Sequence, residues 1–168
     1  MIKLFITDID GVWTDGGMYY DNGENEWKKF NTSDSAGVLF CRLNNIEVAI
    51  ITGEDTNIVK RRARKLKINH VYLGAKHKLK IAQNLCSELG CDLSEVAYIG
   101  DDINDIILLE SVGISFCPSD SPEYIKSRVD QVCNKKGGEG VFREAVEFIL
   151  KSNDLMESTI DAYLNTVK

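Results

Sequence analysis

The chain alternates between short apolar runs rich in Ile and Val and longer segments in which apolar residues recur with helical spacing. This alternation predicts the α/β class, with a doubly wound, mostly parallel sheet covered by helices. Four apolar runs and two weaker ones give five or six strands: residues 2–7, 47–51, 96–99 and 113–116, with 70–73 and 131–133. The predicted helices cover residues 35–45, 54–67, 76–89, 103–111, 121–127 and 140–151.

One segment departs from this alternation. Residues 12–20 and 26–31 have the pattern of extended chain on either side of an Asp-Asn-Gly turn sequence, which predicts a β-hairpin inserted at about 12–31. The hairpin should project over the carboxyl end of the first strand. The length predicts one domain over residues 1–151. In the remaining tail, 152–168, apolar residues have approximate helical spacing, so it packs on a neighbouring subunit or frays.

Composition and charge exclude several classes of protein. The net charge of −6 argues against general nucleic-acid binding, and an anionic substrate would need a local cluster of cations. No stretch approaches the roughly 20 apolar residues of a membrane span, and the amino terminus lacks a signal-peptide pattern, so a cytoplasmic location is expected. Five cysteines without a CxxC pair, beside two histidines, indicate reduced thiols rather than a zinc site.

Acidic and hydroxyl residues cluster where predicted strands end. Asp8 and Asp10 follow the first strand, Thr52 and Gly53 follow the second, and the sequence GDDIND at 100–105 follows the strand at 96–99. In open α/β sheets, ligands bind beyond the carboxyl ends of the strands. If these strands are neighbours, five carboxylates meet at one rim of the sheet, namely those of Asp8, Asp10, Asp101, Asp102 and Asp105.

Such crowding favours a bound cation. Two carboxylates about 4 Å apart repel by roughly 4 kcal/mol at an effective dielectric constant near 20, so the cluster would oppose folding without compensation. Oxygen ligands without a convincing His or Cys set favour Mg²⁺. Any single aspartate here could be a helix cap or a turn residue, but the three strand-end signals together indicate a metal site.

These residues resemble the four motifs of the haloacid dehalogenase superfamily of phosphotransferases. The first motif stands here as DIDGVWT, the second as ITG, the third as a lysine in AKHKLKIA, and the fourth as GDDIND, in that order along residues 2 to about 150. The resemblance implies a Rossmann-like core without a separate cap domain and phosphoryl transfer with Mg²⁺. Within the superfamily, the hairpin and the segment KGGEGVFREAVEFIL look like the 3-deoxy-manno-octulosonate 8-phosphate phosphatases, which are homotetramers whose neighbouring subunits help to close each site.

Two sequence segments indicate a different substrate from that of this subfamily. FNTSDSAG and TGE look closer to the sister phosphatases that act on nine-carbon 2-keto sugar acid 9-phosphates, of the 2-keto-3-deoxynononate and N-acetylneuraminate types. We therefore expect a nine-carbon sugar acid phosphate as substrate, with the eight-carbon compound as the alternative. The two readings imply roles in sialic acid and in lipopolysaccharide biosynthesis, respectively.

The resemblance assigns roles to individual residues. Asp8 is the expected nucleophile and forms an aspartyl-phosphate, and Asp10 is the expected general acid and base. Thr52 supplies a hydroxyl, and Gly53 lets backbone N–H groups approach the phosphoryl oxygens at a helix start. Lys78 neutralises the transferring group, with Lys76 and Lys80 as alternatives if the register is wrong. The expected metal ligands are Asp8, the backbone carbonyl of Asp10 and Asp101, with Asp102 or Asp105 acting through water or orienting Lys78.

Further positions are candidate substrate contacts. Glu54, Arg62 and Lys65 contact the sugar acid by the resemblance, although the run Lys60–Lys65 is equally consistent with the solvated face of an amphipathic helix. Thr32 and Ser33 are candidates as well, with a helix cap as the alternative. The loop before Arg143 is expected near a site, either this chain's own or a neighbour's. Trp13 and Trp27 are expected at a subunit interface rather than in the core or a lid.

Other classes of protein share parts of this pattern. A phospho-acceptor signalling domain also combines clustered aspartates with a Thr and a Lys, but its phosphorylated Asp should follow a later strand, whereas DIDGVWT follows the first. A glycosyltransferase with a DxD metal site would need a longer chain. An inactive relative would lack a catalytic residue, and every position is filled.

Overall fold

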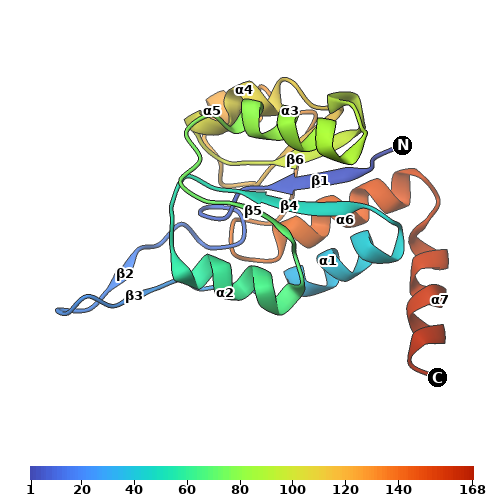
Figure 1. Cartoon of the computed structure of the whole chain (residues 1–168), viewed down its shortest axis with the longest axis horizontal. Coiled ribbons are helices and arrows are strands. Elements are labelled where there is room, and N and C mark those ends of the chain that lie inside the picture. The colour runs from blue at the N-terminus through green and yellow to red at the C-terminus, as the bar shows by residue number, and fades with distance from the viewer.

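The computed structural model describes all 168 residues and contains a six-stranded, fully parallel sheet with helices on both faces (Figure 1). The predicted fold class is confirmed. In sheet order the strands are β5 (His70–Tyr72), β4 (Glu47–Ile51), β1 (Leu4–Thr7), β6 (Val96–Ile99), β7 (Ile114–Cys117) and β8 (Gln131–Val132). All six predicted strands are therefore present.

Two layers of helices cover this sheet (Figure 1). One layer consists of α1 (Ser33–Leu43), α2 (Asn57–Leu66) and α6 (Val141–Ser152). The other consists of α3 (Lys78–Leu89), α4 (Ile106–Leu109) and α5 (Glu123–Lys126). Short 3₁₀ turns, η1 (Leu93–Glu95) and η2 (Ile103–Asp105), precede β6 and α4. The helix predicted over 103–111 is thus divided between η2 and α4.

The strand side chains alternate between two hydrophobic cores. In β1, Phe5 belongs to the core under α1 and α6, whereas Leu4 and Ile6 belong to the core under α3 and α4. Because β1 is covered on both faces, all four of its residues are buried. Each large apolar side chain buried in this way contributes roughly 1.5–3 kcal/mol to folding.

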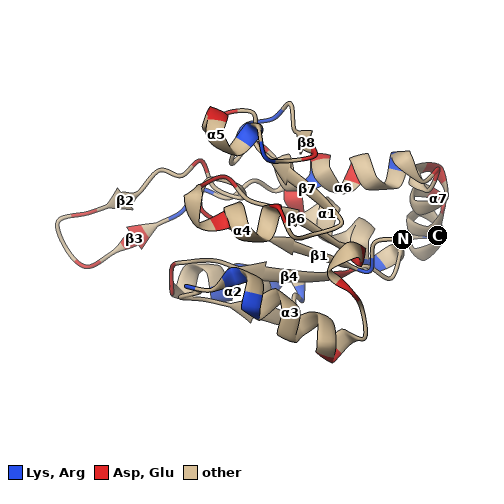
Figure 2. Cartoon of the chain, turned by 90° about the horizontal axis from the view of Figure 1, so that it is seen from above, with Lys and Arg blue, Asp and Glu red and all other residues tan.

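Helix α2 begins three residues later than the sequence predicts. Its N-cap is Thr56, which is in an extended conformation, so residues 54–56 belong to the preceding loop. A Thr at this position favours the end of a helix over its interior. Val59 and Ala63 are buried, and basic residues lie along the outer surface of α2 (Figure 2), as expected for an amphipathic helix.

The hairpin is shorter than predicted, with strands β2 (Tyr19–Tyr20) and β3 (Glu26–Trp27). Its turn is fixed by Asp21, whose carboxylate accepts hydrogen bonds from the backbone N–H of Gly23 at 2.8 Å and from the Asn25 side chain at 2.6 Å. The hairpin projects from the edge of the sheet at which β1 ends (Figure 1). Trp27 is half exposed.

The prediction of an interface position for Trp13 is wrong. The N–H groups of Val12, Trp13 and Thr14 all donate to the carbonyl of Ile9, which forms a tight turn and not an extended strand. The turn carries Trp13 into the core, where it is fully buried and its indole N–H donates to Thr7 Oγ1 at 2.9 Å. Its ring packs against Phe142, with the ring centroids 5.0 Å apart.

The tail forms an additional helix, α7 (Met156–Thr166). Its first turn is anchored to α1, because Asn44 Nδ2 donates to Thr159 Oγ1 at 2.8 Å. Ile160, Tyr163 and Leu164 remain partly exposed on it. No helix in the structure combines the length and the apolar character that crossing a membrane requires. All five cysteines are free thiols, as predicted.

Candidate active site

The site lies where the strand order reverses. From β1 the chain adds β4 and β5 on one side, and then returns to add β6, β7 and β8 on the other. β1 and β6 are hydrogen-bonded neighbours, so the loops that leave their carboxyl ends diverge and open a crevice. Asp8 follows β1 and Asp101 follows the last residue of β6 by one glycine, as the motif spacing predicts.

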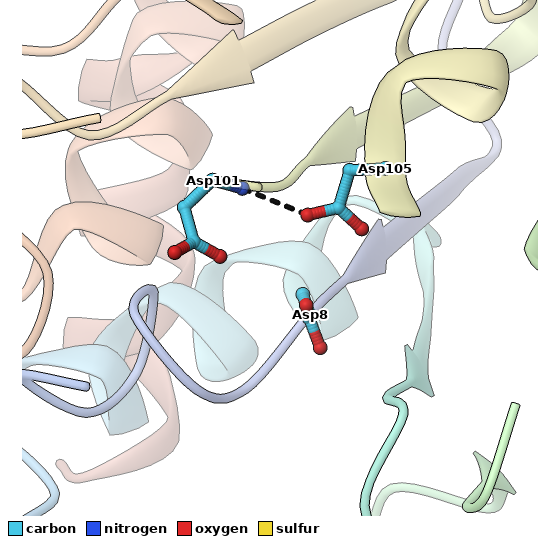
Figure 3. Close-up of side chains that lie close together, drawn as sticks. All are labelled: Asp8, Asp101 and Asp105. Atoms are coloured by element: carbon cyan, nitrogen blue, oxygen red, sulfur yellow. Dashed lines mark hydrogen bonds between the residues drawn. The ribbon is translucent and has the colours of Figure 1, made fainter. Parts of the chain in front are cut away.

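Three carboxylates meet in this crevice. Oxygens of Asp8, Asp101 and Asp105 lie within 4.8 Å of one another (Figure 3). Burial, together with the charge of Asp105, raises the pKa of Asp8 to about 6, although Lys78 opposes the shift. Burial and the charges of Asp8 and Asp105 raise the pKa of Asp101 to about 8. Without a cation, Asp8 and Asp101 therefore bind protons more tightly than ordinary aspartates do.

Lys78, the first residue of α3, supplies one compensating charge. Its buried ammonium group lies 2.8 Å from Asp8 Oδ2 and 2.6 Å from Asp105 Oδ1. Burial lowers the pKa of Lys78, but the two carboxylates outweigh that effect and the net shift is upward, so the lysine stays charged. Lys76 and Lys80 are exposed, and the predicted register is correct.

Asp105 is a structural centre of the site. It is fully buried, and its Oδ2 accepts the backbone N–H groups of Asp101 at 2.9 Å (Figure 3) and Asp102 at 3.1 Å. Its Oδ1 accepts Lys78 and the hydroxyl of Tyr98. Both oxygens are thus engaged by the protein, which supports the prediction that Asp105 orients Lys78. Asp102 caps η2 instead, accepting the N–H of Ile103 at 2.7 Å.

The donor set fits a hard divalent cation. Asp101 Oδ1 is buried without a hydrogen-bond partner, and the neighbouring donors are all oxygens. Mg²⁺ prefers such ligands. The close packing requires Gly11, which has φ +83°, because a Cβ atom there would lie 2.0 Å from Asp101 Oδ2. Asp8 and Asp101 would hold the ion, which would polarise a phosphoryl oxygen.

Asp10 has a different environment from the carboxylate triad. Its Oδ1 accepts the Lys28 ammonium group at 2.7 Å and the Thr14 hydroxyl at 3.3 Å, while Oδ2 is buried without a partner. Lys28 follows β3 in the hairpin, and its ammonium group also lies 3.3 Å from Glu54 Oε2. The sequence analysis missed both Lys28 and Thr14, although Thr14 is the last residue of DIDGVWT.

A small polar cavity of about 140 Å³ opens between these groups. The cavity is lined by Asp8, Asp10, Thr52, Gly53, Glu54, Asp101, Asp102 and Asn104. Thr52 is buried beside the carboxylates, as predicted. Gly53 lines the cavity too, but it precedes α2 by four positions, so the prediction of a helix start at this glycine is wrong. The volume suits one tetrahedral anion such as phosphate.

Four predicted substrate residues do not line this cavity. Arg62 is held against the start of α1, where it donates to the carbonyl of Asn31 at 3.2 Å and to Ser35 Oγ at 3.0 Å. Lys65 is exposed on the outer face of α2. Thr32 is the N-cap residue of α1, without a side-chain capping bond, and Ser33 is next to Gly140. Within one chain these residues therefore lie outside the cavity.

The glycine loop before α6 packs against the first motif. A Cβ at Gly137 would lie 2.0 Å from the carbonyl oxygen of Gly11, and the N–H of Gly138 donates to the carbonyl of Val12 at 2.9 Å. The loop therefore supports the turn after β1 of its own chain, next to Asp8 and Asp10. Arg143 is turned away to pair with Glu147 at 2.7 Å.

This combination of a parallel sheet, an aspartate after β1, a buried lysine and an acidic loop after β6 is that of a phosphoryl-transfer enzyme. The family model of haloacid dehalogenase-like hydrolases matches residues 42–144, and the chain belongs to this family. The predicted enzyme class, a phosphatase of this family, is confirmed.

Similarity to individual proteins is more specific than the match to the family. The chain is 36% identical to the 3-deoxy-D-manno-octulosonate 8-phosphate phosphatase of Haemophilus influenzae, over 99% of this chain and 94% of that protein. It is 38% identical to the same enzyme of Yersinia pestis, over 93% of this chain and 83% of that protein. The crystal structure of the Moraxella catarrhalis enzyme with magnesium, phosphate and the sugar acid matches with a TM-score of 0.90 and 36% identity, over 99% of this chain and 94% of that chain.

Proposed function

We propose that this protein is a Mg²⁺-dependent phosphatase that removes phosphate from 3-deoxy-D-manno-octulosonate 8-phosphate. The observation that carries the proposal is the meeting of Asp8, Lys78 and Asp101 around a phosphate-sized cavity. Full-length similarity to phosphatases named for this eight-carbon substrate supports it. The comparisons thus favour the alternative of the sequence analysis, and the nine-carbon substrate stays a prediction.

The geometry suits two successive displacements at phosphorus. Asp8 Oδ1 accepts the N–H of Ile9 at 2.7 Å and Oδ2 accepts Lys78, which fixes the carboxylate for attack. As the bond from Asp8 to phosphorus forms, the bond to the sugar oxygen breaks, and Asp10 gives that oxygen a proton. Water then attacks the aspartyl-phosphate, Asp10 takes a proton from the water, and Asp8 is released with phosphate.

A nine-carbon sugar acid phosphate is a second candidate. Its support is Glu54, which follows Thr52 and Gly53 in the TGE sequence and lines the cavity. The FNTSDSAG segment favours the same substrate through its resemblance. The two candidates place the enzyme in lipopolysaccharide and in sialic acid biosynthesis, respectively, and both are small anionic sugar phosphates.

The assembly forms part of the proposal. Met18, Tyr19, Tyr20 and Trp27 expose apolar surface on the hairpin, which suits contact with further copies of the chain in a homotetramer. In that assembly Thr32, Ser33, Arg62 and Lys65 would bind the sugar acid at a neighbouring site, since they lie outside the cavity of their own chain. Sedimentation velocity should give a tetramer, and a monomer at all concentrations would contradict this arrangement.

Initial rates on a small panel test the function. The panel contains the eight-carbon 8-phosphate, the two nine-carbon 9-phosphates and simple hexose phosphates, each with Mg²⁺ and with a chelator, and Asp8→Asn is the control enzyme. The proposal is supported if kcat/KM is highest on the eight-carbon ester and if this activity is lost both on chelation of Mg²⁺ and in Asp8→Asn. Preference for a nine-carbon ester establishes the second candidate. Preference for a hexose phosphate, or turnover that survives Asp8→Asn, refutes both.

A further inference from the structure

Lys28 is a buried cation on an otherwise exposed hairpin. Its side chain is only 4% exposed, whereas Trp27 before it and Lys29 after it are exposed. Burying an ammonium group costs several kcal/mol unless charged partners compensate, so a lysine on a surface hairpin normally points to solvent. The inward orientation therefore depends on what it meets in the site.

Three carboxylates face this one ammonium group. Lys28 Nζ lies 2.7 Å from Asp10 Oδ1, 3.3 Å from Glu54 Oε2 and 3.5 Å from Glu26 Oε1. Asp10 and Glu54 come from the loops after β1 and β4, while Glu26 is on the hairpin itself. Lys28 thus connects the hairpin to the two loops that carry the expected acid and the expected leaving-group contact.

The contact also determines how Asp10 is presented. Lys28 and Thr14 both bond Oδ1, which leaves Oδ2 as the buried oxygen without a partner. A general acid must place its proton within hydrogen-bond reach of the leaving oxygen, so the rotation of this carboxylate matters for catalysis. No other ammonium or guanidinium group forms an ion pair with Asp10 in the structure.

We propose that Lys28 is a positioning residue: it fixes the Asp10 carboxylate with Oδ2 free for proton transfer, and couples it to Glu54 and the hairpin. The inference rests on the proposed function, because it assumes that Asp10 serves the leaving group. Lys28 itself transfers no proton and forms no bond to phosphorus. Its loss should therefore slow transfer of the phosphoryl group to Asp8 more for esters with poor leaving groups than for those with good ones. Hydrolysis of the aspartyl-phosphate, which also uses Asp10, is the same step for every ester.

Two esters separate positioning from a merely structural role. A sugar alcohol leaves phosphorus slowly unless it is protonated, whereas p-nitrophenolate leaves without a proton. The parameter to compare is kcat/KM, because it reports formation of the aspartyl-phosphate and not its later hydrolysis. General acid catalysis contributes about 10²–10⁴-fold, so Lys28→Met should lower kcat/KM on the best sugar phosphate of the panel at least about 10-fold more than kcat/KM on p-nitrophenyl phosphate. Lys28→Arg should recover most of the loss, because a guanidinium group can also bridge two carboxylates. Lys29→Met is the matched control and should leave both rates unchanged.

Equal losses of kcat/KM on the two esters, or no loss on either, would overturn the proposal. A crystal structure of Lys28→Met gives a second readout: the Asp10 carboxylate should rotate away while Asp8 and Lys78 stay in place, and an unmoved Asp10 would also contradict the inference. The proposed function fails separately, when the wild-type enzyme prefers an ester outside the sugar acids. In that event the loss caused by Lys28→Met is measured on the preferred alkyl ester and compared with the loss on p-nitrophenyl phosphate, and this comparison still decides the role of Lys28.

Discussion

Replacing Asp34 by asparagine should stabilise the protein, and the gain should depend on pH. Asp34 is fully buried in the first turn of α1. Its Oδ1 accepts the N–H of Arg143 at 3.1 Å, and its Oδ2 has no partner. Burial raises the pKa of Asp34 to about 6, although the Arg143 N–H and the charge of Arg62 oppose the shift. The folded state therefore holds this proton more tightly than the unfolded chain does.

The magnitude follows from the linkage between protons and folding. A pKa raised from 3.8 to about 6 destabilises the fold by about 3 kcal/mol at pH values above 6, since each pKa unit corresponds to about 1.4 kcal/mol. Below pH 3.8 the carboxyl is protonated in both states, and this destabilisation disappears. An asparagine NH₂ group at the Oδ2 position lacks an acceptor, which destabilises the variant by about 1 kcal/mol. The net expected gain at neutral pH is about 2 kcal/mol.

Urea unfolding measured between about pH 4 and pH 8 tests this reasoning. The stability of wild type should fall relative to Asp34→Asn as the pH rises from about 4 to about 6, and the two curves should cross between about pH 4 and pH 5, where the two effects cancel. Asp161→Asn, at an exposed position of α7, is the control and should follow wild type throughout. A difference between Asp34→Asn and wild type that is constant over this range, or a variant less stable at pH 8, would refute the assignment of a raised pKa.

Three further outcomes are expected from the site and the core. Mg²⁺ should raise the midpoint of thermal unfolding and a chelator should remove the gain, because the ion relieves the repulsion between Asp8 and Asp101; scanning fluorimetry of Asp101→Asn should show little Mg²⁺ response. Gly11→Ala should weaken Mg²⁺ binding about 10–100-fold by calorimetry, since its Cβ displaces Asp101, and unchanged affinity would contradict the close packing. Trp13→Ala should lower the free energy of unfolding by about 3–5 kcal/mol, because the side chain is fully buried. Trp27→Ala should change the free energy of unfolding of the isolated chain by less than about 1 kcal/mol. A larger loss for Trp27→Ala than for Trp13→Ala would contradict the core position of Trp13.

Much of the site could be predicted because it depends on parallel strands. Residues after the carboxyl ends of adjacent strands must meet, so Asp8, Thr52 and Asp101 converge whatever the details of the loops. The motif spacing also selected Lys78 from three nearby lysines. The strand runs were predictable for the same reason, because a strand covered on both faces has to be apolar throughout.

The side-chain positions in the hairpin and in the turn before it could not be predicted from the strand pattern. Lys28 and Lys29 are adjacent, and only the register of a two-residue ladder decides which of them faces the site. Trp13 suits a core and an interface equally well by composition, and the turn closed on Ile9 decides between them. The position of Arg62 depends on how α2 packs against the start of α1, and that distance is not encoded locally.

The bonds from Tyr98 through Asp105 to Lys78 have a consequence for engineering this enzyme. Tyr98 belongs to the apolar cluster that also contains Leu85 and Leu108, so the ammonium group beside Asp8 is supported from the interior under α3 and α4. Volume changes in that layer should reach the reaction centre as small displacements. The contact between α1 and α7, which lies outside this cluster, is the better place to seek thermostabilising substitutions that leave turnover intact.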